Sequence, residues 1–340
     1  MINYILLAAL IAGFYVGWNI GSNDAANAMG VPVGGRVISY RRAIVIIMLF
    51  VLLGAVLEGW KVMETVSSGI VTSPQVGNPL VEIPIIAIIA LFAAGLWVTI
   101  ATTFKLPVST SQAIVGSVIG GGLLLSFTGP ISATSVNLGV LGKIGLAWVL
   151  TPIGAALFAY IIYHAAGVGL RRIGSVTKLN RVLGLLIIVT GAFTAYSLGA
   201  NSVGNATAMI YVVSESTGSE IAWTPRVIGL FGGIALATGA ITYSRRVMET
   251  VGGGITRLDA TTAFAAQFGA GATVWIFIQF GIPVSTSQAI VGGVAGAGLV
   301  KGTAAVSRRK LGEIAGAWIL TPTVAAGLTF LIGFVVLVVS

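Results

Sequence analysis

The sequence predicts an all-α integral membrane protein made of two repeats with inverted topology. Of its 340 residues, 56% are hydrophobic and only 8% are charged, whereas about a quarter of the residues in a soluble domain are charged. Ten apolar runs approach the roughly 20 residues that a helix needs to cross a bilayer. In addition, ten residues, PVSTSQAIVG, occur at 107–116 and again, unchanged, at 283–292.

The apolar runs divide evenly between the two halves of the chain. We expect them near 2–33, 42–60, 83–104, 108–127 and 143–164, and then near 182–213, 226–243, 260–280, 283–300 and 312–338. The connections at 105–106 and 281–282 are very short. Each half therefore has about five apolar segments, which either all cross the bilayer or include a re-entrant helical hairpin around the duplicated motif.

The basic residues predict the orientation in the membrane. If every run crosses and the N-terminus lies outside, all of the 18 Lys and Arg residues except Lys61, Lys143 and Arg226 lie on the cytoplasmic side. This asymmetry follows the positive-inside rule. Five crossings in each half then place the second half in the opposite orientation to the first. We expect Glu58, with Trp60 and Lys61, at the outer interface.

Three further pairs of similar segments extend the repeat over nearly the whole chain. Segments 21–28, 63–66 and 147–152 match 199–206, 248–251 and 317–322. We therefore expect a first transmembrane repeat over 1–164, a basic cytoplasmic linker over 165–181 and a second, inverted repeat over 182–340. Inverted repeats with interrupted helices are typical of secondary transporters, whose site lies between the repeats near the middle of the membrane.

The duplicated motif indicates two helix N-termini that carry hydroxyl groups. Pro is favoured at the start of a helix, and Ser or Thr caps its free N–H groups. Such an end attracts anions, because N–H groups and the positive end of the helix dipole point the same way. The candidate substrate ligands here are Ser109, Thr110, Ser111, Ser285, Thr286 and Ser287. Many donors with little net charge suit a tetrahedral oxyanion, either phosphate or sulfate.

Asp24 is an ionisable residue inside an apolar run, which makes it a functional candidate. Asn23 and Asn27 flank it four residues apart, so that we expect them on one helix face. Gly21 and Gly30 would allow local unwinding that frees carbonyls for an ion. Carboxylate and amide oxygens suit Na⁺, and a proton is the alternative.

The second half repeats this cluster without its charge. Asn201 and Asn205 correspond to Asn23 and Asn27, but Ser202 replaces the carboxylate. We assign Asn23, Asn201 and Ser202 to the substrate together with the hydroxyls. We assign Asp24, Asn27, Gln112, Asn205 and Gln288 to the coupling cation, with Asp24, Asn27 and Asn205 as the Na⁺ candidates.

Composition excludes several other classes of protein. The chain has no Cys, and His164 is its only His, so a thiolate metal site or a catalytic triad has almost nothing to use. No nucleophile–base pair lies in the apolar runs, which argues against an enzyme. The net charge of +9 is distributed over short loops and suits membrane orientation better than nucleic-acid binding.

The motifs at 21–28, 107–112, 199–206 and 283–288 resemble those of the inorganic phosphate transporter (PiT) family, in its short prokaryotic form. The resemblance implies symport of phosphate coupled to Na⁺ or H⁺ across the plasma membrane, by a multi-pass protein that forms a homodimer. It carries the phosphate and cation sites onto Asn23, Asp24, Asn27, Asn201, Asn205 and the two Ser-Thr-Ser-Gln runs.

Two departures from that family matter. Many members repeat the Asp where this chain has Ser202, and many have Thr-His where this chain has Ser-Gln at 111–112 and 287–288. These departures bear on the number of cations and on the choice between phosphate and sulfate, since related proteins include sulfate permeases. Outside this class, the remaining alternative is a passive anion channel, which would not need Asp24.

Overall fold

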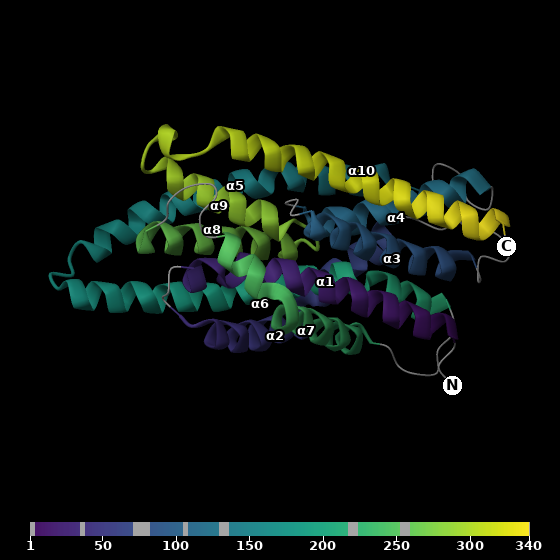
Figure 1. Ribbon diagram of the computed structural model, residues 1–340, viewed down its shortest axis with the longest axis horizontal. Helices are drawn as coiled ribbons and strands as arrows, with labels where there is room; N and C mark the ends of the chain where they lie inside the picture. Colours follow the sequence, from purple (N-terminus) through teal and green to yellow (C-terminus); the bar gives the residue numbers. More distant parts are fainter. Residues whose placement is uncertain are drawn as a thin grey trace.

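The computed structural model describes residues 4–34, 38–70, 82–104, 108–128, 136–216, 224–251 and 259–339, and every regular element in these ranges is a helix (Figure 1). The α-helices are α1 (Tyr4–Gly34), α2 (Tyr40–Glu64), α3 (Glu82–Thr103), α4 (Thr110–Thr128), α5 (Leu138–Leu170), α6 (Val176–Ser216), α7 (Pro225–Val251), α8 (Ala260–Gln279), α9 (Thr286–Leu299) and α10 (Arg308–Val339). A π-helical turn, η1 (Thr65–Gly69), continues α2, and a 3₁₀ turn, η3 (Thr303–Ala305), precedes α10.

The all-helical membrane fold is confirmed, but the ten apolar runs are not ten full crossings. Within the described residues, nine helices are long and apolar enough to cross a bilayer. The exception is α9, whose 14 residues extend only about 21 Å, less than the hydrocarbon core of about 30 Å.

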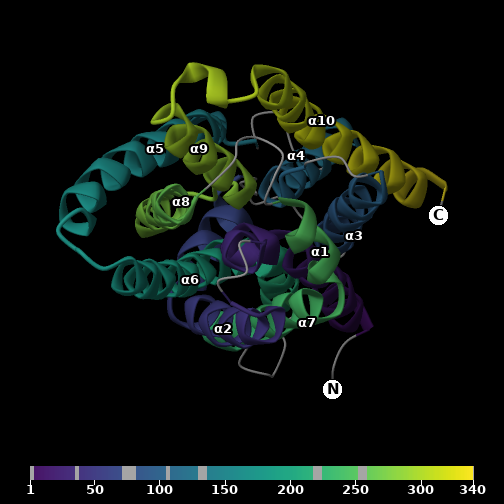
Figure 2. The ribbon, with the colours of Figure 1, turned by 60° about the vertical axis from the view of Figure 1, so that its left-hand side comes forward.

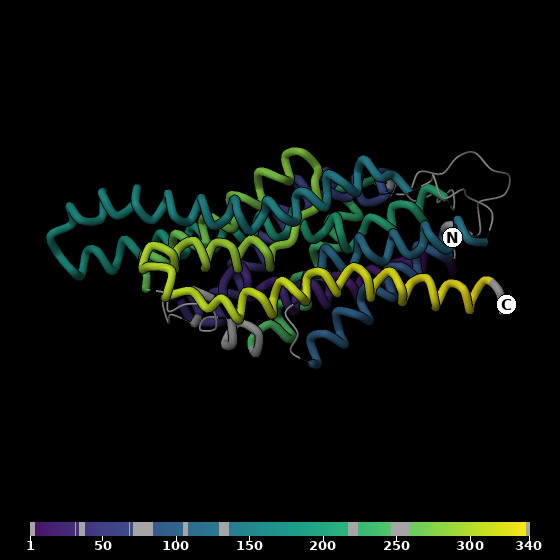
Figure 3. Tube along the Cα trace, turned by 90° about the horizontal axis from the view of Figure 1, so that it is seen from above, coloured from purple at the N-terminus to yellow at the C-terminus, as the bar shows by residue number. Residues whose placement is uncertain are grey.

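Two hairpins enter the bundle from opposite ends. The α3–α4 hairpin lies in the half of the molecule that contains both chain termini, and α8–α9 lies in the other half, toward the α5–α6 connection (Figures 1 and 3). The longer helices run past both hairpins. The starts of α4 and α9, which carry the duplicated motif, therefore meet near the middle of the bundle, as expected for re-entrant hairpins. Each half contributes three helices that are longer than those of its hairpin, α1, α2 and α5 in the first half and α6, α7 and α10 in the second. Three crossings in each half, an odd number, would still suit inverted repeats.

The helices of the two sequence halves are interleaved. In the first half, α1 packs mainly on α7 and α2 on α6, while α4 packs on α10 and α5 on α9 (Figure 2). Glycines allow two of these contacts to be very close: a Cβ on Gly116 would lie 2.3 Å from the Pro322 carbonyl oxygen, and one on Gly292 would lie 2.2 Å from that of Pro152. These contacts join corresponding positions of the two motifs, and small residues of this kind are typical of packed membrane helices.

The stretch 165–181, which we expected to be a basic cytoplasmic linker, includes the end of α5 and the start of α6. Helix α5 continues to Leu170, and helix α6 begins at Val176. Most of that stretch therefore consists of helix ends, and the assignment of the two repeats to 1–164 and 182–340 stays a prediction.

Large apolar side chains cover the outside of the bundle. On α10, Ile319 is 75% exposed and Leu331 is 63% exposed, and Ile153 and Leu157 of α5 are each 58% exposed. Surface of this composition is stable only in contact with lipid or with another apolar surface. The chain is thus a multi-pass membrane protein.

Candidate functional site

The first residue of each Ser-Thr-Ser run caps its helix. The Ser285 hydroxyl accepts a hydrogen bond from the Gln288 backbone N–H at 3.2 Å, and the Ser109 hydroxyl accepts one from the Gln112 N–H at the same distance. Ser285 has the extended backbone usual for a capping residue. Pro107, which precedes the first run, lies outside the described residues. Two of the six predicted hydroxyls therefore already have a partner in their own helix.

The two hairpin tips contact each other directly. The Ser111 hydroxyl donates to the Val284 carbonyl oxygen at 2.8 Å. Asn201 of α6 binds the same residue twice, since its amide nitrogen donates to the Val284 carbonyl at 2.8 Å and its amide oxygen accepts from the Val284 N–H at 3.1 Å. Hydrogen bonds from both α4 and α6 thus hold the second tip in place.

Asp24 lies beside both tips and is almost fully buried. Thr110 donates to one carboxylate oxygen at 3.0 Å, and the Asn27 amide approaches the other at 3.5 Å. The Asn27 amide nitrogen is also 3.4 Å from the Thr286 hydroxyl and 3.2 Å from that of Ser287. A carboxylate of α1 therefore faces hydroxyls that come from both halves of the chain.

Asn205 occupies the corresponding place in the second half. Its amide nitrogen donates to the Ser111 hydroxyl at 2.9 Å and to the Asn201 carbonyl at 3.2 Å. Asn27 of the first half thus contacts the second tip, and Asn205 of the second half contacts the first. Ser202 is buried near the Asp24 carboxylate, but its Oγ makes no hydrogen bond of good geometry.

Several buried acceptors at this site have no hydrogen-bond donor. They are Gln112 Oε1, Gln288 Oε1 and Asn205 Oδ1. A buried polar atom without a partner costs about 1–3 kcal/mol, and each such atom requires an explanation. All three are amide oxygens, which together with the Asp24 carboxylate make a set of hard oxygen ligands suited to Na⁺. Across the described ranges, no group of three or more His, Cys, Asp or Glu residues is placed to hold a metal.

The structure separates Asn23 from this cluster. Its amide nitrogen donates to the Asn19 carbonyl at 3.0 Å, and its amide oxygen accepts from Thr102 of α3 at 3.2 Å. Asn23 and Asn27 thus contact different helices instead of sharing one site. The expected unwinding at Gly21 and Gly30 is also absent, because α1 is helical from Tyr4 to Gly34.

Two polar residues near the site were missed in the sequence. Asn19 accepts a hydrogen bond from Thr99 at 3.0 Å, which extends the contact between α1 and α3. Gln267 of α8 donates to the Ala28 carbonyl, next to Asn27, and its own side-chain oxygen is buried without a donor. The sequence did contain a signal for Asn19 and Gln267, because each is a polar amide residue inside an apolar run and is therefore a functional candidate.

A small cavity adjoins the site. Beside Asn27 and Thr286, a cavity of about 10 Å³ is lined also by Thr194 and Leu198. This volume holds about one water-sized group. This cavity is too small for a tetrahedral oxyanion.

Membrane helices around two facing hairpin tips and a buried carboxylate are features of membrane transporters. Residues 20–185 and 168–329 match the phosphate transporter family. The chain is 30% identical to a putative phosphate permease of Pyrococcus furiosus, over 96% of this chain and 95% of the relative, and 32% identical to one of Methanocaldococcus jannaschii, over 96% and 95%. A solved structure, the sodium-dependent phosphate transporter, superposes with a TM-score of 0.86 at 27% identity, and the match covers 99% of this chain and 100% of that one.

The chain belongs to the phosphate transporter family. Its relatives are permeases and transporters and not enzymes.

Proposed function

We propose that the protein carries inorganic phosphate across the membrane together with a cation, Na⁺ first. The observation that carries the proposal is the meeting of the two Ser-Thr-Ser tips at Asp24, whose carboxylate faces hydroxyl groups from both halves of the chain. The first turns of both tips also carry amide oxygens that are buried without a hydrogen-bond donor. The family match and the names of the relatives support phosphate as the substrate. The name of the solved neighbour supports Na⁺.

The cation binds first in this mechanism. A carboxylate at mid-membrane repels an anion, so a cation held by Asp24 and the amide oxygens of Gln112, Gln288 and Asn205 neutralises the site before phosphate approaches. Phosphate then accepts hydrogen bonds from the hydroxyls at the tips and from the free N–H groups of the first turns of α4 and α9. One of these hydroxyls, that of Ser111, also donates to the Val284 carbonyl oxygen of the opposite tip, a contact that phosphate would replace.

The direct contact between the two tips favours a transporter over the passive channel. A channel needs a continuous path, whereas Ser111 of the first tip donates to the Val284 carbonyl oxygen of the second at 2.8 Å. Phosphate entry must separate the tips on one side, and closure must precede opening on the other. Sulfate has a similar shape and stays the alternative substrate. The homodimer implied by the family resemblance also stays a prediction.

Uptake of radiolabelled phosphate into liposomes tests the proposal. We expect accumulation above the external concentration when an inward Na⁺ gradient is imposed, and competition by sulfate measures selectivity. Accumulation driven equally well by a proton gradient without Na⁺ would make H⁺ the coupling ion. Uptake that only equilibrates, whatever the gradient, would instead indicate a channel.

Ser202 offers a test of cation number. We expect Ser202→Asp to add a second carboxylate beside Asp24, which raises the number of cations needed for neutrality. The dependence of uptake on Na⁺ concentration should become steeper, while the phosphate-to-sulfate preference changes little. Ser202→Ala is the matched control and should retain the parent Na⁺ dependence. A changed preference with unaltered Na⁺ dependence would contradict the prediction.

A further inference from the structure

The turn of the α8–α9 hairpin lies directly against the end of α2. Helix α8 ends at Gln279, and Gly281, with a φ of +66°, turns the chain toward α9. A Cβ on Gly281 would lie 3.0 Å from the Lys61 carbonyl oxygen and 3.1 Å from the Thr65 hydroxyl. Because the hairpin enters from the end of the bundle assigned to the cytoplasm, this contact is on the outer side of the Ser285–Ser287 tip.

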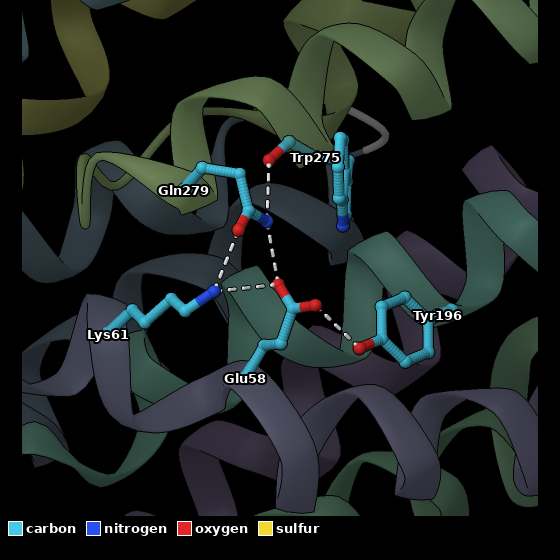
Figure 4. A network of polar contacts seen from close by, with 5 residues as sticks. All are labelled: Glu58, Lys61, Tyr196, Trp275 and Gln279. Atoms are coloured by element: carbon cyan, nitrogen blue, oxygen red, sulfur yellow. Dashed lines mark hydrogen bonds and ion pairs between the residues drawn. The ribbon is translucent and has the colours of Figure 1, made fainter.

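A network of side chains from three helices holds this turn in place (Figure 4). The Gln279 amide nitrogen donates to Glu58 at 2.7 Å, and the Gln279 amide oxygen accepts from Lys61 at 2.8 Å. Lys61 is 3.3 Å from the same carboxylate oxygen of Glu58. The other oxygen of Glu58 accepts from the Tyr196 hydroxyl at 2.8 Å. Both ends of the Gln279 amide and both oxygens of Glu58 are therefore used.

The exposure of this network suits a contact that breaks and re-forms. The side chain of Lys61 is 22% exposed and that of Glu58 is 18% exposed. A fully buried ion pair is very costly to separate, and a fully exposed one contributes little. At intermediate exposure, water can replace the lost partners when the hairpin moves.

The base of the same hairpin is anchored separately. Lys301, which follows α9, lies 2.9 Å from Asp259, which caps α8. Burial alone would raise the pKa of Asp259, but the Thr262 backbone N–H and Lys301 hold this pKa below its usual value, so the pair is ionised at neutral pH. The hairpin therefore has separate polar contacts at its base and at its tip, and the network at the tip is the one that joins it to α2.

The corresponding corner of the first hairpin is built differently. By the repeated motifs, Thr103 corresponds to Gln279, and its hydroxyl donates to the Thr99 carbonyl of its own helix at 2.8 Å. Trp18 and Tyr243 correspond to Tyr196 and Glu58, and their rings contact each other with centroids 6.1 Å apart. Among the side chains that the structure describes, the two halves thus use an ionic network at one corner and an aromatic pair at the other.

We propose that Glu58, Lys61, Tyr196 and Gln279 form a latch that holds the α8–α9 tip closed on the outer side of the site, and that this latch opens in each transport cycle. Its role in the cycle rests on the proposed symport. Its effect on access to the tip does not, and access can be measured without transport.

Single-cysteine labelling tests the latch, because the chain contains no Cys. Ile282→Cys places one thiol in the hairpin turn, and a membrane-impermeant maleimide added to intact cells reports its exposure to the outside. Gln279→Leu removes both amide contacts, and Glu58→Gln removes the charge that binds Lys61. We expect either change to accelerate labelling about tenfold, as the loss of a hydrogen bond to a charged group implies.

Thr103→Val at the corresponding position of the first hairpin is the matched control and should label at the parent rate. Tyr196→Phe, which removes one hydroxyl, provides a milder variant if the others fail to fold, and it too should label faster. Unchanged labelling in Gln279→Leu or, where that variant does not fold, in Tyr196→Phe would overturn the latch. If the variants label faster but the parent protein accumulates no phosphate in liposomes, the proposed latch would stand and the proposed symport would be rejected.

Discussion

Replacing Asp24 by Asn is expected to abolish concentrative phosphate uptake while leaving the protein folded. The amide still accepts from Thr110, whose hydroxyl is 3.0 Å from the carboxylate, so the local packing is kept. The charge that holds the cation is lost, and removal of one partner of a buried charge pair costs about 2 kcal/mol or more, roughly thirtyfold in affinity. Na⁺-driven uptake into liposomes measures the effect.

The control for Asp24→Asn is a second carboxylate, outside the candidate site, that is also replaced by its amide. Glu313 pairs with Arg309 at 3.1 Å on the surface of α10, where its side chain is 53% exposed. Glu313→Gln should leave uptake unchanged, because an exposed pair contributes little. Undiminished accumulation in Asp24→Asn would remove the coupling role from this carboxylate.

The second large effect is expected from Gly292. Its Cα faces Pro152 of α5 so closely that a Cβ would lie 2.2 Å from a backbone carbonyl oxygen, and backbone atoms cannot move aside as a flexible side chain can. Gly292→Ala should therefore destabilise the fold by about 3 kcal/mol or more. Thermal unfolding in detergent and the yield of monodisperse protein are the measurements.

Gly327 on α10 provides the matched comparison for Gly292. A Cβ there would meet nothing within 4 Å, so Gly327→Ala should leave stability unchanged or slightly increased, since Ala favours a helix more than Gly does. Equal stability of the two variants would mean that the close contact between α9 and α5 is not required.

The duplicated motif allowed the meeting of two helix starts to be predicted. Identical helix starts in an inverted repeat imply two tips related by symmetry, and the structure brings Ser111 and Val284 into contact. The position of Asp24 inside an apolar run predicted that its carboxylate is buried and functional. A charge at that depth in the membrane is costly, so it is retained only where it has a role.

Other features depended on neighbours that the sequence does not reveal. Gly21 was interpreted as a point of unwinding, but a Cβ there would lie 1.9 Å from the Leu236 carbonyl oxygen, so this glycine serves helix packing. Asn23 was grouped with Asn27 by spacing, yet Thr102 of α3 binds it instead. Sequence periodicity predicts which residues share a helix face but not which helix that face meets.

The interleaved packing also constrains how the chain can be assembled after synthesis. Helices α1 and α2 find their main neighbours, α7 and α6, only in the later half. Until that half is inserted, Asp24 lacks the Ser202 region and the second tip that enclose it, and Asn27 lacks Thr286. The early half is therefore an incomplete intermediate held in the bilayer, and separately expressed halves should be stable only when they are produced in the same cell.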